Sequence, residues 1–365
     1  MNLFVANPEW GWWIIAYFFL GGIAAACYFI AAFVELVGLE EDQPLARLGY
    51  RIAFLLVLVC GALLTIDLER PERFWHMLFQ SEVVHEALDA GWPWSAAGWS
   101  AMAYAPMLKH WSPMSIGAWA LFLFGAFSLV SCWAAIWPAG RIARLLHWRW
   151  FSWPWHLAGS AVGFFVAAYT GVLLEATNQP IWSQTDWLGP LFLASAASTG
   201  LATLVLLGRR RAFGATTEER VHRAEGTALG LELVVFLIFA ASLGPWLTLL
   251  LRLPEGLLLL AGPLVIGMLA PLVLHMGWFG RGRAVSWLSA VLVLAGGLLL
   301  RYAVVSVAPK LLEREIAVSA QPVGTPTTWF AISPEDNRER GGGPGASALN
   351  RPDPIQPRSN VIREE

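Results

Sequence analysis

Long apolar segments, separated by shorter polar ones, recur along most of the chain. Each is long enough to cross the roughly 30 Å hydrocarbon core of a bilayer as a helix of about 20 residues. The pattern predicts eight transmembrane helices, at residues 12–38, 49–67, 115–137, 155–176, 187–207, 226–251, 256–279 and 284–306. Only Arg252, Pro254 and Glu255 interrupt the apolar sequence between the sixth and the seventh, so we expect a tight hairpin there.

The composition agrees with a membrane protein. Of the 365 residues, 57% are hydrophobic, only 14% are charged and 21 are tryptophan, a profile that a water-soluble domain of this length does not show. The net charge of −2 and the scattered basic residues give no reason to expect nucleic acid as a partner. The first apolar segment neither follows a basic stretch nor precedes a small-residue cleavage site, so we expect a retained helix and not a signal peptide.

Arginine and lysine residues are unevenly divided between the two sets of loops. The loops after the first, third, fifth and seventh helices contain most of them, for example Arg141, Arg144 and Arg149. Because cytoplasmic loops of membrane proteins are enriched in Lys and Arg, these loops are predicted to face the cytoplasm. An even number of helices then places both termini outside the cytoplasm.

Two outer segments differ from the other connections. Residues 68–114 form a long, tryptophan-rich loop, which we expect to fold over the outer face because loops of this length are commonly functional. Residues 308–365 are rich in Pro, Gly, Arg and Glu and cannot bury a core. We therefore expect an all-α transmembrane domain of residues 1–307, followed by a mostly extended extracytoplasmic tail that could bind along the surface of a partner.

Charged residues crowd the end of the second apolar segment, between Asp67 and Arg73. Isolated charges in hydrocarbon cost roughly 2.5–3.5 kcal/mol each, so this cluster must lie at a water interface, in a polar cavity or against a partner. A proline follows Arg70 and ends any arriving helix. The cluster is either a structural helix terminus or an ion-pair network, whose members would be Asp67, Glu69, Arg70 and Arg73.

Four ordered motifs in the first half of the chain resemble those of one family. They are Trp13-Ile-Ile-Ala-Tyr-Phe-Phe-Leu-Gly-Gly, Asp67-Leu-Glu-Arg-Pro-Glu-Arg-Phe, Ser112-Pro-Met-Ser-Ile-Gly-Ala-Trp and Tyr169-Thr-Gly-Val-Leu-Leu-Glu-Ala-Thr-Asn-Gln-Pro-Ile-Trp. In this combination the chain resembles the NrfD/polysulfide-reductase membrane-subunit family. The second half is similar to that family in helix count and hydrophobicity.

The resemblance implies a quinone-binding membrane anchor of two four-helix bundles, free of haem and iron–sulfur clusters. It also implies a location in the bacterial cytoplasmic membrane, with an iron–sulfur protein and often a molybdopterin-type catalytic subunit docked on the outer face. On this basis the chain would exchange electrons and protons between menaquinone or ubiquinone and the iron–sulfur partner.

Two tyrosines match the positions at which the family holds the quinone headgroup, near the outer ends of helices one and four. At about 1.5 Å per residue, Tyr17 lies roughly 8 Å below the start of the first helix and Tyr169 roughly 13 Å below Asn178. Both phenols therefore fall in the outer leaflet, where a hydroxyl can hydrogen-bond a quinone carbonyl. The alternative is that both tyrosines are interfacial anchors or form inter-helix hydrogen bonds.

Quinol oxidation releases two protons, which need acceptors near the headgroup. Asp67, closest to the apolar run, and Glu175, at the same outer level, are predicted to handle protons; the alternatives are a structural helix terminus and a solvated helix end. His76 and Asn178 are cofactor-binding candidates because they lie near these residues in sequence. The side chains expected to face the iron–sulfur partner are Glu69, Arg70 and Arg73.

Ionisable residues also occur in the inner half, where they are costly and commonly functional. We predict that they form a partial proton path from the cytoplasm toward the quinone pocket, which would make turnover electrogenic. Its members are Glu35 on the first helix, Glu225 and Glu232 on the sixth, and His275 on the seventh. The alternative is that Glu232 is a buried hydrogen-bonding residue and the others are interfacial.

The cysteines and histidines give no sign of a metal site or haem in this chain. Cys27, Cys60 and Cys132 lack the close spacing of an iron–sulfur or zinc site. Of the seven histidines, only His156 and His275 approach a helix interior, both near the cytoplasmic end, and one such pair at an edge is weak evidence for haem ligation. Two other functional classes stay open: a secondary transporter, which can use Gly/Pro-broken helices, and a structural anchor without a quinone site.

Overall fold

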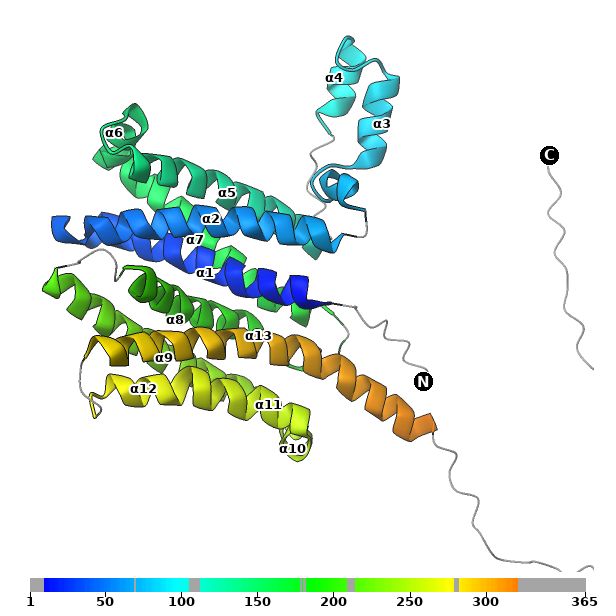
Figure 1. Ribbon diagram of the computed structural model, residues 1–365. Helices are drawn as coiled ribbons and strands as arrows, with labels where there is room; N and C mark the ends of the chain where they lie inside the picture. Colours follow the sequence, from blue (N-terminus) through cyan, green and yellow to red (C-terminus); the bar gives the residue numbers. More distant parts are fainter. Residues whose placement is uncertain are drawn as a thin grey trace, which may run out of the picture. The chain divides into compact units, whose positions relative to one another are not determined.

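The computed structural model describes residues 10–68, 70–104, 112–177, 179, 182–208, 214–278 and 282–320. All regular structure in these residues is helical, as Figure 1 shows. Eight helices among them are long and apolar enough to cross a membrane. The predicted all-α class and the eight predicted spans are thereby confirmed.

Shorter helical elements connect the eight spans. The spans are α1 (Trp12–Val37), α2 (Gln43–Asp67), α5 (Pro113–Ile136), α7 (Arg149–Glu175), α8 (Leu188–Gly208), α9 (Ala215–Ser242), the consecutive α11 (Pro254–Gly262), η4 (Pro263–Leu269) and α12 (Ala270–His275), and α13 (Arg283–Ala320). The shorter elements are η1 (Glu40–Asp42), η2 (Pro71–Met77), α3 (Ser81–Asp89), α4 (Ala96–Met102), α6 (Arg141–His147), η3 (Trp182–Gln184) and α10 (Pro245–Arg252). η4 is a π-helical stretch, and it precedes Pro271, which has no N–H to donate to the helix.

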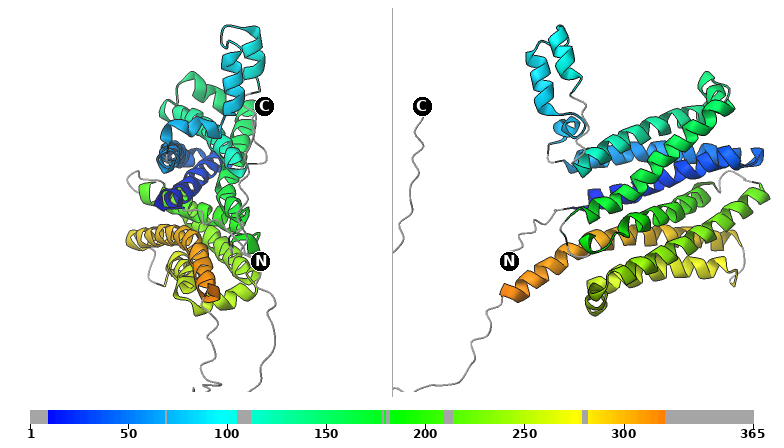
Figure 2. Two further views of the ribbon diagram at one scale, coloured as in Figure 1. Left: turned by 90° about the vertical axis from the view of Figure 1, so that its right-hand side faces the viewer. Right: turned by 180° about the vertical axis from the view of Figure 1, so that it is seen from behind.

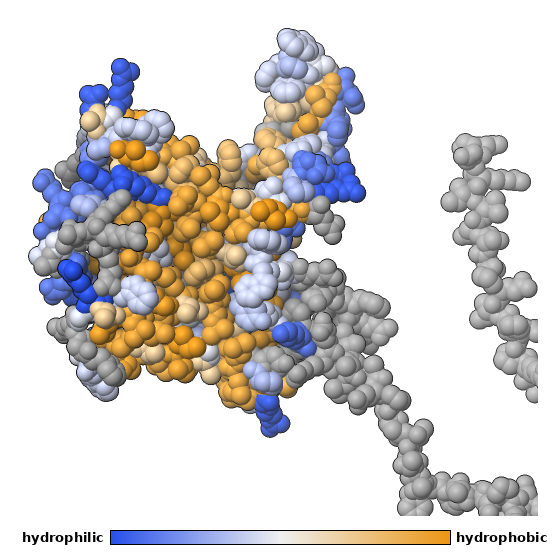
Figure 3. All heavy atoms as spheres, viewed as in Figure 1, coloured by the Kyte–Doolittle hydropathy of each residue, from blue (hydrophilic) through white to orange (hydrophobic). Residues whose placement is uncertain are grey.

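Successive spans run in opposite directions, so the helical region has two ends (Figures 1 and 2). What we call the N-terminal end comprises the starts of α1, α5, α8 and α11 and the last turns of α2, α7 and α9. The α6 end comprises α6, the start of α9 and the last turn of α12. Figure 3 shows polar residues toward both ends and an apolar surface between them. Spans expose large apolar side chains such as Leu55, Phe122 and Leu157, as helices in contact with lipid do.

α1 is the most central helix. It contacts α2, α7 and α8, and contacts of α5 with α2 and α7 close a ring of the first four spans. Small residues allow the closest approaches: a Cβ added at Gly200 would lie 2.3 Å from the Ala26 Cβ, and one added at Gly296 would lie 2.0 Å from the Gly267 Cα. Such contacts stabilise helix pairs in lipid, where burial of apolar surface gives no advantage.

The sixth span differs from the sequence prediction. α9 begins at Ala215 and ends at Ser242, so both boundaries lie earlier than the predicted 226–251. Gly244 adopts a positive φ of 53° and is followed by Pro245, a combination that ends a helix. The tight turn expected at residues 252–255 is present, since only Leu253 separates α10 from α11, but the helix that enters it is the short α10 and not the sixth span.

The described part of the long outer loop, residues 68–114, is largely helical and contains η2, α3 and α4. Two hydrogen bonds attach η2 to α5. The Ser115 hydroxyl donates to the Met77 carbonyl at 3.1 Å, and the Trp119 indole N–H donates to the Leu78 carbonyl at 3.0 Å. η2 is therefore fixed at the N-terminal end of α5, whereas folding of the whole loop over the outer face stays a prediction.

The last helix is longer than predicted. α13 continues to Ala320, past the expected end of the eighth span at residue 306. The first part of the predicted tail, residues 308–320, is therefore helical and not extended. The reason is local, because Lys310-Leu-Leu-Glu-Arg-Glu consists of strong helix formers. The rest of the predicted tail lies outside the described residues.

Candidate functional site

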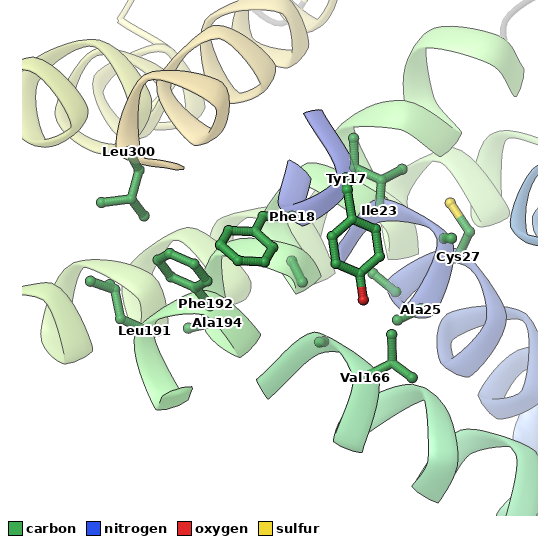
Figure 4. Close-up of a cluster of buried hydrophobic side chains, with 14 of the residues drawn as sticks. Tyr17, Phe18, Ile23, Ala25, Cys27, Val166, Leu191, Phe192, Ala194 and Leu300 are labelled. Atoms are coloured by element: carbon green, nitrogen blue, oxygen red, sulfur yellow. The ribbon is translucent and has the colours of Figure 1, made fainter. Parts of the chain in front are cut away.

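Tyr17 and Tyr169 belong to a small cluster near the N-terminal end. Tyr17 of α1 is only 4% exposed, and its ring centroid is 5.6 Å from that of Phe18. Figure 4 shows its hydroxyl pointing from α1 toward α7, and the two phenols are near enough to interact electrostatically. Cys60 of α2 completes the cluster, with its Sγ 4.0 Å from the Tyr17 carbonyl oxygen. The structure thus brings together the two tyrosines that the sequence assigned to one pocket.

Tyr169 is held in place by α5. Its hydroxyl donates a 2.6 Å hydrogen bond to the Pro113 carbonyl, which is the inter-helix bond that the sequence left open as an alternative. Its ring lies so close to Gly117 that a Cβ there would be 2.3 Å from a ring carbon. Because the phenol proton is used in the bond to Pro113, the oxygen is left with lone pairs that can accept a hydrogen bond from a ligand hydroxyl.

Asp67 is the last residue of α2, and its side chain is exposed. It follows Cys60 by seven residues, which is close to two helical turns, so both side chains lie on one face of α2 roughly 10 Å apart. Since Cys60 contacts Tyr17, Asp67 stands at the exposed end of the face of α2 that packs against α1.

The charged stretch after α2 is exposed where the structure describes it. Arg70 and Arg73 are both exposed, and no described residue forms an ion pair with either of them or with Asp67. Glu69, the other member of the predicted ion-pair network, lies outside the described residues. Both arginines are therefore accessible to an external partner.

His76 lies in η2 and is partly buried. η2 is bound to the first turns of α5. Tyr169 of α7 also hydrogen-bonds the first residue of α5, so His76 and Tyr169 both lie near the start of α5. Asn178, the other predicted cofactor-binding neighbour, lies outside the described residues.

Glu175 ends α7 and binds the start of α8. Its Oε1 accepts a 3.0 Å hydrogen bond from the Gly189 backbone N–H. The first N–H groups of a helix have no partner within that helix, so this carboxylate satisfies one of them and lies at the positive end of the α8 dipole. The sequence did not anticipate this contact, because it depends on how α7 and α8 pack.

At the α6 end, Glu35 lines a polar cleft together with residues from four other helices, α2, α5, α6 and α7. Its Oε1 is 3.4 Å from the His147 Nε2. The Tyr50 hydroxyl is 2.9 Å from the His156 Nδ1, and both side chains line the same cleft. The His156 Nε2 is buried without a hydrogen-bond partner. The sequence selected Glu35 but not these partners, which come from α2, α6 and α7.

Glu225 of α9 and His275 of α12 meet at the α6 end. The His275 Nε2 lies 3.6 Å from the Glu225 Oε2 and 3.0 Å from the His222 carbonyl oxygen. The rings of His222 and His275 stack with their centroids 4.0 Å apart. Two of the predicted proton-path residues are therefore neighbours, and His222 joins them.

Glu232 is buried in α9 and accepts a 2.5 Å hydrogen bond from the Ser198 hydroxyl of α8. Arg301 of α13 is 1% exposed and interacts electrostatically with Glu232. Its guanidinium donates to the Ser195 hydroxyl and, at 3.2 Å, to the Phe192 carbonyl. The buried carboxylate thus has a cationic counterpart, as charges within membranes usually do.

Arg301 also approaches α1. A Cβ added at Gly22 would lie 3.4 Å from a guanidinium nitrogen of Arg301, and Gly22 follows Tyr17 by five residues. Sequence reasoning missed Arg301, although it is the only Asp, Glu, Lys or Arg in the predicted span 284–306. A lone charge in an apolar span was the signal that identifies it.

Comparison with known proteins assigns the chain to a family. The sequence model of the family described as "Polysulphide reductase, NrfD" matches residues 5–310. The chain belongs to this NrfD family. It is 28% identical over 207 residues to one chain of the polysulfide reductase of Wolinella succinogenes, which is 54% of this chain and 58% of that protein. It is also 28% identical over 78 residues to one subunit of the selenate reductase of Mesobacillus selenatarsenatis, which is 21% of this chain and 18% of that protein.

The NrfD match extends beyond the four motifs of the first half. It covers the second half as well, and with it Glu225, Glu232, His275 and Arg301. The resemblance seen in the motifs is therefore confirmed for nearly the whole chain. The chain spans less than two thirds of the length of the curated relatives it matches.

Proposed function

We propose that this NrfD-family chain is the membrane subunit of a respiratory oxidoreductase complex. In this proposal it exchanges electrons and protons between membrane quinone or quinol and an extracytoplasmic iron–sulfur subunit, which in turn binds a molybdopterin-type catalytic subunit. The family match supports the class of protein, and the two curated relatives are, by name, parts of a polysulfide reductase and a selenate reductase. The chain would not act alone on the final substrate.

The observation that carries the proposal is that Tyr17 and Tyr169, from the packed spans α1 and α7, lie near enough to interact electrostatically. A quinone headgroup is an apolar ring with two polar oxygens, so its site needs apolar walls and one or two polar groups. Phe18 and Cys60 adjoin Tyr17 and supply apolar wall. The Tyr169 oxygen, whose proton is bound to Pro113, is suited to accept a hydrogen bond from a quinol hydroxyl.

Proton and electron transfer must balance at this site. Quinol gives up two electrons and two protons on oxidation, and the same numbers are taken up on reduction. We propose that Asp67, at the exposed end of α2, and His76, in η2, exchange these protons with the outer solvent. Glu175, through its bond to Gly189, would hold the start of α8 against α7 and so position Tyr169.

The N-terminal end is proposed to face outward from a bacterial cytoplasmic membrane. Arg141 and Arg144 lie in α6, at the opposite end, and arginine-rich connections favour the cytoplasm. The exposed Arg70 and Arg73, together with Glu69, would then meet the iron–sulfur partner. The first four and the last four spans would form the two four-helix bundles that the family resemblance implies.

The buried polar residues of the last four spans support a proton path that begins at the α6 end. Glu225 and His275 are neighbours there, and Glu232 follows Glu225 by seven residues, on nearly the same face of α9. Arg301 interacts with Glu232 and approaches Gly22 of α1, so it extends this row of polar residues toward Tyr17. Protons exchanged with the cytoplasm along this row would cross most of the membrane, which makes turnover electrogenic.

Glu35 is proposed as part of a second proton-uptake site at the same end. Its neighbour His147 and the bonded pair of Tyr50 and His156 line one cleft with it. The Tyr28 ring, whose centroid is 5.3 Å from that of Tyr50, extends these aromatic and polar groups further into the first four spans.

Substitution of Tyr169 tests the quinone site. Tyr169→Phe keeps the ring against Gly117 and removes only the hydroxyl. We expect quinol-dependent turnover of the purified complex to fall about tenfold, which corresponds to one lost hydrogen bond of about 1.4 kcal/mol. Tyr104→Phe is the matched control, because Tyr104 is exposed, and should leave turnover unchanged.

Purification from native membranes in mild detergent gives a second readout. Stoichiometric iron in a co-purifying cysteine-rich chain would support the proposal, and molybdenum would narrow the class of catalytic subunit. If Tyr169→Phe and Tyr104→Phe have equal turnover and quinone-site ligands do not inhibit the complex, the chain would instead be a structural anchor without a quinone site. A preparation without metal or partner would favour a secondary transporter.

A further inference from the structure

Three side chains with metal-ligating atoms meet at the α6 end. His222 and Glu225 lie on α9 and His275 lies on α12, and one ligand atom from each is within 4.8 Å of the others. His222 and Glu225 are three residues apart and therefore share one face of α9. His275 is 53 residues from His222 in sequence, so only the packing of α12 on α9 brings the three together.

The Glu225 carboxylate provides a second, independent observation. Glu225 is 1% exposed, and its Oε1 is buried without a hydrogen-bond partner. Its other oxygen is 3.6 Å from the His275 Nε2, which is longer than a hydrogen bond. A buried polar oxygen without a partner is costly and rare, so this carboxylate points to a ligand that the protein itself does not supply.

We propose that His222, Glu225 and His275 bind a divalent transition-metal ion of the zinc type. Zn²⁺ binds imidazole nitrogen and carboxylate oxygen at about 2.0–2.2 Å, so ligand atoms around a tetrahedral ion lie about 3.3 Å apart. The separation of 3.6 Å between the Glu225 and His275 atoms is close to this value. The other ligand atoms, which are up to 4.8 Å apart, come closer by side-chain rotation. A water molecule takes the fourth coordination position of the ion.

The His275 ring fits a metal ligand after one exchange: its Nε2 lies 3.0 Å from the His222 carbonyl oxygen, so the ion must replace the proton that Nε2 shares with that oxygen. The His275 ring also interacts with the backbone of Pro271, one helical turn earlier. Ligating histidines usually fix their ring in this way, by binding a carbonyl or carboxylate with the nitrogen that does not bind the metal. A bound ion would link α9 to the last residue of α12.

Metal binding would have a consequence for the proposed proton path. Glu225 and His275 stand at the cytoplasmic start of that path, so an ion held between them would block it and lower proton translocation per electron. The binding itself does not depend on the proposed function, whereas this inhibition rests on it.

Titration of the purified, chelator-treated complex tests the metal site. We expect the wild-type complex to bind about one Zn²⁺ at this site, and Co²⁺ to give the intense visible absorption of a four-coordinate ion. Glu225→Gln and His275→Asn should each weaken binding by at least about tenfold. His85→Asn is the control, because His85 is an exposed residue of α3, and should bind like the wild type.

Absence of the Co²⁺ absorption from the wild-type complex would overturn the metal site, and so would equal Zn²⁺ uptake by the wild type and all three variants. The wild-type measurement needs no substitution, so a variant that fails to fold cannot hide the result. If Zn²⁺ binds but leaves proton translocation per electron unchanged, the site stands and its link to the proposed path is refuted.

Discussion

A single buried arginine connects several spans. Arg301 of α13 donates to Ser195 and to the Phe192 carbonyl of α8, and it approaches Gly22 of α1. A buried guanidinium is tolerated only with hydrogen bonds and a counter-charge, and Glu232 supplies that charge from α9. Arg301 therefore interacts with three other spans, α1, α8 and α9, through its hydrogen bonds, its close approach to Gly22 and its pairing with Glu232.

Arg301→Met should destabilise the protein, because Glu232 would remain buried without its cationic neighbour. Breaking one side of a buried pair costs about 3–5 kcal/mol, so the apparent melting temperature in detergent should fall clearly. Arg252→Met is the matched control. Arg252 is exposed, and its replacement should change stability by less than about 0.5 kcal/mol.

The double variant Arg301→Met/Glu232→Gln separates pairing from packing. It leaves no unpaired charge, so it should be more stable than Arg301→Met alone. If the losses of the two single variants simply add in the double variant, Arg301 and Glu232 do not act as a pair.

At the residue scale, the sequence identified charged residues better than their partners. Glu225 and Glu232 could be selected because ionisable residues in apolar spans are rare, and Arg301 carried the same signal. His222 carried none, since it lies in the polar approach to a span and becomes a neighbour of His275 only when α12 packs on α9. Spacing along one chain segment does not predict contacts between separate helices.

At the scale of elements, the packing of α5 on α7 is what positions Tyr169. Gly117→Ala would place a Cβ 2.3 Å from a carbon of the Tyr169 ring, so either the ring or α5 must move. We expect the bond from Tyr169 to Pro113 to break, with a loss of about 1–3 kcal/mol in stability and lower quinol-dependent turnover. Thermal unfolding and turnover of the purified complex measure both effects.

Gly61→Ala is the matched control for this substitution. A Cβ at Gly61 in α2 would meet nothing within 4 Å, and alanine favours a helix by up to about 1 kcal/mol over glycine. This variant should therefore be as stable as the wild type or more so. Equal behaviour of the two alanine variants would mean that close packing on Gly117 does not position Tyr169.

The number of spans could be predicted from hydropathy alone, because lipid requires long apolar helices. Their boundaries could not, since apolar sequence continues past the point where a helix ends. α9 ends before Gly244 and Pro245, although the segment that follows them is just as apolar. The attachment of η2 to α5 depends on backbone carbonyls, which no sequence pattern marks.

For the whole molecule, the separation of the two ends is the main consequence of the fold. The tyrosine cluster lies near the N-terminal end, and the cluster of His222, Glu225 and His275 lies at the α6 end. The sequence predicted this separation from the alternation of spans and from the distribution of arginines. It also placed Glu232 on a path from the α6 end toward the tyrosines, but it missed Arg301, whose position depends on contacts among α1, α8, α9 and α13.

Glu232→Gln tests whether this intermediate position matters for proton transfer. The substitution preserves size and can still hydrogen-bond Ser198, but it cannot carry a proton as a carboxylate does. In proteoliposomes we expect proton translocation per electron to fall by about tenfold or more, because the path from the α6 end is interrupted. Glu219→Gln is the control on the same helix, since Glu219 is exposed and lies outside the proposed path.

Comparison of the two glutamine variants then decides between path and packing. Electron transfer between quinol and the partner should continue in both, because the tyrosine cluster is unchanged, so the loss in Glu232→Gln should be confined to charge movement. Equal proton translocation by Glu232→Gln, Glu219→Gln and the wild type would refute the path. In that case Glu232 would be a buried residue that accepts a hydrogen bond from Ser198 and interacts electrostatically with Arg301, and its role would be to hold α8, α9 and α13 together.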